Sequence, residues 1–140
     1  MLLLDNSAWA RLELPTLAES RLVEVANLIE GGEIPVCTPF LLEAGWSARN
    51  ATHHDELLAD LLQLPHLRID ADVEDAALDA QRDLARRGHH RSASPSDLLI
   101  AACAHIHGAG VLHYDRDYDV LVELSHLAFE SHWLAPAGTL

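Results

Sequence analysis

Four acidic residues stand where regular elements of this chain are expected to begin or end. An α/β fold brings at least two of them together at the edge of its sheet, although they lie far apart in the sequence. Carboxylates gathered around one point repel each other, so such a cluster requires a divalent cation and predicts a metal site. The four are Asp5 in LLLDNS, Glu43 in TPFLLEAGW, Asp97 in SPSDLLIAA and Asp115 in GVLHYD.

Two of these acids also suit the start of a helix. Asp5 can cap the short helix that follows it, and Ser7 is then either the cap itself or a hydrogen-bonding partner of the acid. Asp97 lies in the first turn of a predicted helix, where the helix dipole favours an acid and a capping role also fits. The helix behind Asp97 is apolar nearly all round, which predicts that it is buried and can carry a ligand group.

Glu43 lies in a predicted helix that has little polar surface. On the helical wheel it falls between Phe40 and Trp46. A buried carboxylate without a partner is costly, so Glu43 is expected to have a cation, an arginine or a metal nearby, or to be protonated. The alternative is an ordinary glutamate on the surface.

Asp115 opens the acidic run DRDYD. Its spacing of two resembles the start of a calcium-binding loop, but no glycine or closing glutamate follows at the required positions, which excludes that loop. A solvated helix start remains the alternative for Asp117 and especially for Asp119.

The composition limits the chemistry further. With 140 residues, 49% of them hydrophobic, the chain is expected to form one ordered domain over residues 1–140. Its net charge of −13 argues against a wide nucleic-acid surface. All nine basic residues are arginines, which excludes Schiff-base and phosphate-loop lysines.

One basic concentration stands out, the segment RRGHHRS at 86–92, shortly before Asp97. Arginines can bind phosphate through two parallel hydrogen bonds, but they also gather at helix C-termini because of the helix dipole. Both interpretations stay open. The candidate phosphate-contacting residues are Arg82, Arg86, Arg87 and Arg91.

Short apolar runs alternate with helical stretches along the chain. This alternation predicts an α/β fold of three layers, a parallel sheet of about five strands with helices on both faces. Ligands bind at the carboxyl ends of such strands, so Asp5 and Asp115 meet if the first and fourth strands are neighbours. Strands are predicted at 2–4, 34–38, 67–70, 110–115 and 127–134, and helices at 7–13, 17–30, 39–50, 54–62, 73–87, 95–107 and 116–124, with Thr38, Asp72 and Ser94 as caps.

The sequence also bears on location. No apolar run approaches the ~20 residues of a membrane span. The N-terminus lacks the basic region of a signal peptide, so a cytoplasmic protein is expected. Cys37 and Cys103 lie in apolar contexts and are expected to be buried free thiols.

The motifs together resemble a known family. LLLDNSAW, the mid-helix glutamate of TPFLLEAGW and the stretch GHHRSASPSDLLIAACAHIHGAGVLHYDRDYD resemble a PIN-domain ribonuclease, specifically a VapC-type toxin of a bacterial toxin–antitoxin pair. The resemblance spans nearly the whole chain. It implies a central parallel sheet of order 3-2-1-4-5, which makes the first and fourth strands neighbours.

The resemblance also implies a site and a reaction. Asp5, Glu43, Asp97 and Asp115 match the family's acidic positions for Mg²⁺ or Mn²⁺, and Asp117 matches a further acidic position. The family hydrolyses RNA phosphodiesters and leaves a 5′-phosphate and a 3′-hydroxyl. Our hypothesis is that Asp5, Asp97 and Asp115 are metal ligands, while Glu43 orients or deprotonates the attacking water.

The resemblance further implies partners. These are a VapB-like antitoxin, whose basic C-terminal segment reaches the acidic site, a second copy of the toxin, and a toxin–antitoxin hetero-oligomer. DNA is expected to be bound by the antitoxin rather than by this chain.

Two other functions compete with this one. A metal-dependent phosphohydrolase for small phosphate esters is weakened by the missing lysine and by the absence of an Asp-x-Asp pair at the first strand. A non-catalytic PIN-fold binding module has no reason to retain four mutually repelling acids.

Overall fold

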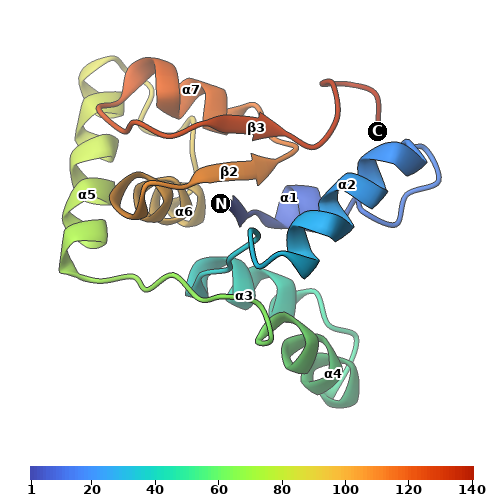
Figure 1. The fold of residues 1–140 in the computed structure, drawn as a ribbon. Helices are drawn as coiled ribbons and strands as arrows, with labels where there is room; N and C mark the ends of the chain where they lie inside the picture. The colour runs from blue at the N-terminus through green and yellow to red at the C-terminus, as the bar shows by residue number, and fades with distance from the viewer.

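The fold is built on a short parallel sheet. The computed structural model describes all residues 1–140 and contains strands β1 (Leu2–Leu4), β2 (Gly110–His113) and β3 (Ser131–Trp133) in the order β1-β2-β3 (Figure 1). All pairs are parallel, with Leu3 opposite Val111. The predicted adjacency of the first and fourth strands is therefore confirmed.

The predicted second and third strands, 34–38 and 67–70, are not regular strands. Their one bridge joins Val36 to His66, so pairing begins just before the predicted third strand. Proline explains the interruption, because Pro35 lies inside the second segment and has no N–H to give to a sheet ladder.

Isolated hydrogen bonds nevertheless extend the sheet in the predicted order. The Leu4 N–H donates to the Pro35 carbonyl at 3.0 Å, and the Leu67 N–H donates to the Val36 carbonyl at 2.9 Å. The extended segments thus lie beside β1, and the chain follows the 3-2-1-4-5 arrangement with two irregular members.

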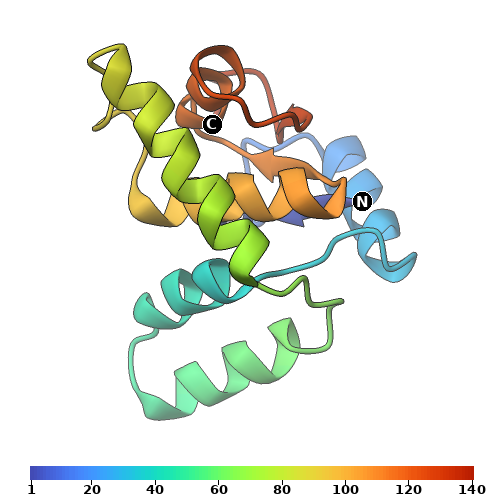
Figure 2. The same cartoon turned by 90° about the vertical axis from the view of Figure 1, so that its left-hand side faces the viewer.

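Helices flank the sheet on both sides. In Figure 1, α5 and α6 lie to the left of the strands and α1 and α2 to the right, and Figure 2 shows α5 crossing α6 in front of the strands. The helix α6 packs on both β1 and β2. The helices are α1 (Asn6–Trp9), α2 (Glu19–Glu30), α3 (Thr38–Trp46), α4 (Ala51–Leu61), α5 (Ala71–Arg86), α6 (Pro95–His107) and α7 (Asp117–Leu124).

Several helix boundaries differ from the prediction because other side chains provide the caps. Cys37, not Thr38, is the N-cap of α3, without a side-chain cap bond. Asn50 accepts the His53 N–H at 2.8 Å and caps α4. The preceding helix therefore ends early, at Trp46.

The N-terminus of α5 is also displaced. Asp70 accepts the Val73 N–H at 3.0 Å and is the N-cap, so the predicted cap Asp72 lies in the first turn instead. The helix dipole favours an acid both at the N-cap and in the first turn, so spacing alone did not distinguish Asp70 from Asp72 as the cap.

The buried helix α6 agrees with its prediction from end to end. Ser94 and Asp97 form a reciprocal capping box at its start, and Gly108 ends it in the left-handed conformation with φ of 67°. Its central residues are buried against the sheet, and Cys103, like Cys37, is a buried free thiol. None of the helices combines the length and apolar character needed to cross a membrane.

Gly110→Ala is expected to destabilise the protein by about 1–2 kcal/mol. A Cβ at Gly110 would lie 2.8 Å from Leu2 Cδ2 and 3.0 Å from the Glu130 carbonyl oxygen, so β2 cannot accept it without shifting its neighbours. Urea unfolding measures the change. An unchanged unfolding midpoint would contradict the close approach of β1 and the segment before β3.

Candidate metal centre and active site

The carboxyl ends of β1 and β2 place two of the predicted acids at one edge of the sheet. Asp5 follows β1 directly, and its N–H donates to the Leu112 carbonyl in β2 at 3.0 Å. Asp115 lies two residues beyond the end of β2. Since the strands are parallel neighbours, both side chains start from the same edge.

Three carboxylates meet at this edge. One oxygen each from Asp97, Asp115 and Asp117 lies within 4.8 Å of the other two. Asp97 comes from the first turn of α6 and Asp117 from that of α7. Carboxylate oxygens are the ligands that Mg²⁺ and Mn²⁺ prefer, so this donor set fits such a cation.

Asp5 lies outside this group of three, and both oxygens of its carboxylate accept hydrogen bonds. One oxygen, Oδ2, accepts the N–H of Ser7 at 2.8 Å and also the Ser7 hydroxyl. The other, Oδ1, accepts the hydroxyl of Tyr118 at 2.7 Å. Asp5 therefore caps α1, and Ser7 is its hydrogen-bonding partner.

Ser7 also ties the two strand ends together. Its hydroxyl oxygen accepts the backbone N–H of Tyr114 at 2.8 Å while its proton goes to Asp5. This serine therefore fixes the segment after β1 to the segment after β2, next to Asp115.

Asp97 acts as a helix cap and as a member of the acid group. Its Oδ2 accepts the Ser94 N–H at 3.2 Å, and its own N–H donates to the Ser94 hydroxyl at 3.1 Å. Burial, together with the charges of Asp5 and Asp115, raises the pKa of Asp97 to about 6, although the hydrogen bonds from Ser94 oppose the rise. Capping and metal binding are thus compatible, because only one oxygen is used by the cap.

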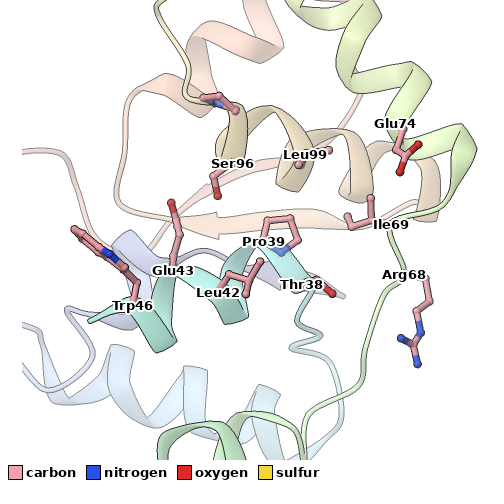
Figure 3. Close-up of a pocket in the computed structure, with 11 residues that line it drawn as sticks. Thr38, Pro39, Leu42, Glu43, Trp46, Arg68, Ile69, Glu74, Ser96 and Leu99 are labelled. Atoms are coloured by element: carbon pink, nitrogen blue, oxygen red, sulfur yellow. The ribbon is translucent and has the colours of Figure 1, made fainter. Parts of the chain in front are cut away.

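Glu43 stands apart from the three-carboxylate group. It is half-buried on α3, and Figure 3 shows it pointing toward Ser96 at the start of α6. Burial raises the pKa of the Glu43 carboxyl, the Ser96 hydroxyl opposes this, and the charge of Asp5 adds to it. The Ser96 hydroxyl is buried and has no hydrogen-bond partner of normal geometry.

The buried histidine at the end of β2 is a site residue that the sequence did not identify. His113 Nδ1 accepts the Asp115 N–H at 3.1 Å, so the proton lies on Nε2, which donates to Ser131 Oγ at 2.7 Å. Burial lowers the pKa of His113 and keeps the imidazole neutral. This imidazole fixes the backbone from which the Asp115 carboxylate projects.

Asp119 completes this network, which corrects its interpretation as a solvated helix residue. Its carboxylate accepts the Ser131 hydroxyl at 2.5 Å and the Trp133 indole N–H at 3.0 Å. Neither partner lies close in sequence, which is why the run DRDYD did not reveal the role of Asp119. Asp117, by contrast, faces the acid group.

Tyr118, between these two acids in sequence, was also missed. Its side chain is fully buried, and its hydroxyl oxygen lies 2.7 Å from Asp5 Oδ1 and 3.4 Å from Asp97 Oδ1. Burial and the charges of Asp5 and Asp97 raise the pKa of Tyr118, so the phenol remains a hydrogen-bond donor. It connects Asp5 to the group of three.

A pocket of about 820 Å³ opens beside Glu43. The residues that line it come from α3, from α5 with the segment just before it, and from the start of α6 (Figure 3). Two large apolar side chains on its rim are unusually exposed, Trp46 at 91% and Leu42 at 68%. The residues that line the pocket are Thr38, Pro39, Leu42, Glu43, Trp46, Arg68, Ile69, Glu74, Pro95, Ser96 and Leu99.

None of the four candidate arginines forms an ion pair with an acid of the site. Arg82 is paired with Asp79 at 2.6 Å, Arg91 is exposed, and Arg86 and Arg87 line a separate hollow that Asp83 and Glu123 share.

Another arginine is connected to the site. Arg11 donates to the Ser7 carbonyl at 2.8 Å, and its guanidinium lies 4.7 Å above the ring of Tyr114. Arg11 lies only four residues after Ser7 in the sequence, and this spacing is the signal that could have identified it.

Comparison with known proteins agrees with this architecture. The family model described as the PIN domain matches residues 2–124. Ribonuclease VapC18 of Mycobacterium tuberculosis is 35% identical over 138 residues, covering 97% of this chain and 96% of that protein. Ribonuclease VapC51 of the same organism is 36% identical over 138 residues, covering 99% and 96%.

Solved structures give the same fold. A DNA-bound VapBC complex from Salmonella typhimurium contains a chain that matches with a TM-score of 0.72 at 20% identity, covering 96% of this chain and all of that one. A chain of VapBC-5 from Mycobacterium tuberculosis matches with a TM-score of 0.62 at 20% identity, covering 92% and 96%. At this identity the likeness concerns the fold.

Asp97→Asn is expected to stabilise the metal-free protein at neutral pH. The folded-state pKa of Asp97 is about 6 against an ordinary 3.8, so the folded protein holds a proton that the unfolded chain has lost. The stability that the folded protein gains from binding this proton is therefore fully present below pH ~4 and is lost as the pH rises toward 6. The variant escapes that loss, so its unfolding free energy relative to wild type should rise by roughly 1–2 kcal/mol across this window.

Urea unfolding in EDTA between acidic and neutral pH measures this difference. A constant offset between variant and wild type at every pH would contradict the raised pKa.

Proposed function

This chain belongs to the PIN-domain family and to its VapC type, and we propose that it is a metal-dependent endoribonuclease, the toxin of a toxin–antitoxin pair. Relatives named as ribonucleases match it over nearly its full length. The observation that carries the proposal is the meeting of Asp97, Asp115 and Asp117 at the edge where β1 and β2 end. We assign hydrolysis of RNA phosphodiester bonds to this edge.

The proposed cofactor is Mg²⁺ or Mn²⁺. Asp97, Asp115 and Asp117 would hold it, with Asp5 joining from the end of β1. When bound, such a cation neutralises charge on the scissile phosphate and lowers the pKa of a water molecule, which makes hydroxide available near neutral pH. The three-carboxylate donor set of hard oxygens supports this choice.

Glu43 is proposed to handle the attacking water. A general base works best when its pKa lies near the working pH, and burial moves the pKa of Glu43 upward, in that direction. The unpartnered Ser96 hydroxyl opposite Glu43 offers a second polar group for a bound water. Asp5, Asp97 and Asp115 are proposed as ligands and thus as catalytic residues together with Glu43.

The RNA substrate must approach a chain whose net charge is −13. Local arginines are therefore needed. Arg86, Arg87 and Arg91 remain candidates for phosphate contacts, whereas the ion pair with Asp79 weakens the case for Arg82. Arg11 is better placed, since it contacts the same Ser7 that holds Asp5.

The proposed protein partner is a VapB-like antitoxin with a basic C-terminal segment. Three of the matching structures are VapBC complexes, and two of these three are bound to DNA. A segment with apolar side chains and one arginine or lysine suits the pocket next to Glu43, where Trp46 and Leu42 are exposed. We further propose a toxin homodimer within a hetero-oligomer, with DNA contacted by the antitoxin and the activity located in the cytoplasm.

The two competing functions are less well supported. A small-molecule phosphohydrolase and a non-catalytic binding module both leave unexplained why relatives named as ribonucleases match nearly the whole chain. The three-carboxylate group also argues against a module that only binds. Its carboxylates repel each other, and binding a partner does not require that repulsion.

Asp5→Asn and Asp115→Asn are each expected to lower Mn²⁺-dependent cleavage of RNA by about 100-fold or more. Each variant removes one negative ligand while keeping the side-chain shape. Asp55→Asn, an exposed acid on α4, is the matched control. Cleavage of total RNA and of p-nitrophenyl phosphate, with Mn²⁺ and with EDTA, measures the effect.

Wild type should cleave RNA only with the metal and should leave the small ester intact. Full activity in Asp5→Asn or Asp115→Asn contradicts the assignment. Preferential hydrolysis of the ester would support the phosphohydrolase instead.

Trp46→Ser is expected to weaken binding of a basic antitoxin segment by about 10-fold or more, because an aromatic anchor is lost from the pocket rim. The melting temperature of the isolated protein should not change, since the Trp46 side chain is 91% exposed. Calorimetric titration with the C-terminal peptide of an antitoxin encoded beside this chain measures the affinity. Equal affinity of the peptide for wild type and for Trp46→Ser would show that the antitoxin segment does not bind in this pocket.

A further inference from the structure

The hydroxyl of Tyr118 occupies the space between two buried carboxylates. Asp5 is 3% exposed and Asp97 is 9% exposed. Tyr118 Oη lies 2.7 Å from Asp5 Oδ1 and 3.4 Å from Asp97 Oδ1. A single phenolic proton therefore lies where two negative charges face each other.

The other oxygens of both acids already have their own donors. Asp5 Oδ2 is served by the N–H and hydroxyl of Ser7, and Asp97 Oδ2 by the N–H of Ser94. The two Oδ1 atoms have no hydrogen-bond donor except the Tyr118 hydroxyl. Without it, two buried carboxylate oxygens would face each other unsatisfied, which is costly in a protein interior.

We propose that the Tyr118 hydroxyl is a placeholder for the cation. In the metal-free protein it binds Asp5 and keeps this carboxylate out of the group formed by Asp97, Asp115 and Asp117. When a divalent cation binds, it takes over the neutralisation of the acids and Asp5 moves from the phenol to the cation. This inference rests on the metal site of the proposed function.

Two observations support a role for the hydroxyl separate from that of the ring. Asp5 is the one strand-end acid outside the three-carboxylate group, and its Oδ1 is held by this phenol. The ring itself is held by other contacts. Its centroid lies 4.8 Å from that of His113 and 6.4 Å from that of Phe129. Tyr118→Phe should therefore remove the donor and leave the packing in place.

The placeholder has a thermodynamic signature. Loss of the hydroxyl should destabilise the empty protein more than the metal-bound protein, because the cation neutralises the same acids. By linkage, a change that raises the free energy of the empty state alone makes the cation bind more tightly. A hydroxyl with only a structural role would lower stability equally in both states.

The experiment compares wild type, Tyr118→Phe and the control Tyr114→Phe, whose hydroxyl bonds the C-terminal segment at Pro136 and Leu140. Thermal unfolding is recorded in EDTA and in saturating Mn²⁺, and Mn²⁺ affinity is measured by electron paramagnetic resonance of the free ion. Tyr118→Phe should melt about 5 °C below wild type in EDTA and close to it in Mn²⁺. Its Mn²⁺ dissociation constant should fall about 10-fold, and that of Tyr114→Phe should not change.

An equal loss in melting temperature with and without Mn²⁺, or unchanged or weaker Mn²⁺ binding, would overturn the placeholder alone. Absence of Mn²⁺ binding by wild type would overturn the proposed metal site, and the placeholder with it.

If Tyr118→Phe does not fold in either condition, the comparison moves to an Asp5→Asn background, where one of the facing charges is gone. In that background, Tyr118→Phe should lower the melting temperature by less than half as much as the control Tyr114→Phe lowers it. A fully unfolded double variant would overturn the proposal.

Discussion

Repulsion among carboxylates at one edge of a parallel sheet is the constraint on which this structure depends. Parallel strands end side by side, so side chains that follow them are brought together whether or not their charges agree. Here Asp5 and Asp115 follow neighbouring strands, and Asp97 enters from the buried helix α6. Burial makes the repulsion stronger and raises the pKa of Asp97 to about 6. The same charge density makes the edge suitable for a divalent cation.

The surrounding fold supplies donors that make this charge tolerable. Ser7 and Tyr118 serve Asp5, and Ser94 serves Asp97 through the capping box of α6. His113 binds the backbone of Asp115 and is itself oriented through Ser131. Hydrogen bonds to a carboxylate stabilise its charged form, so each of these residues lowers the cost of keeping an acid at this edge. Asp5, Asp97 and Asp115 therefore belong to one hydrogen-bond network, from which Glu43 stands apart.

The sequence predicted much of this arrangement because local chemistry determines it. The apolar helix α6 with Ser94 before it and Gly108 after it, and the strands that end at Asp5 and before Asp115, follow from capping and periodicity. The irregular pairing of residues 34–38 was not foreseen, although Pro35 was visible in the sequence. Asp119 was misjudged because its partners, Ser131 and Trp133, come from a distant strand. Long-range partners of this kind cannot be derived from spacing alone.

We propose that the acids at the ends of β1 and β2 form a site for a divalent cation. Diffraction from crystals grown with Mn²⁺, collected at the manganese absorption edge, shows whether a cation binds there. We expect anomalous density within coordination distance of Asp97, Asp115 and Asp117, with the Asp5 carboxylate turned toward it. Crystals in which this edge shows no anomalous density at saturating Mn²⁺, or in which manganese binds only elsewhere on the surface, would contradict it.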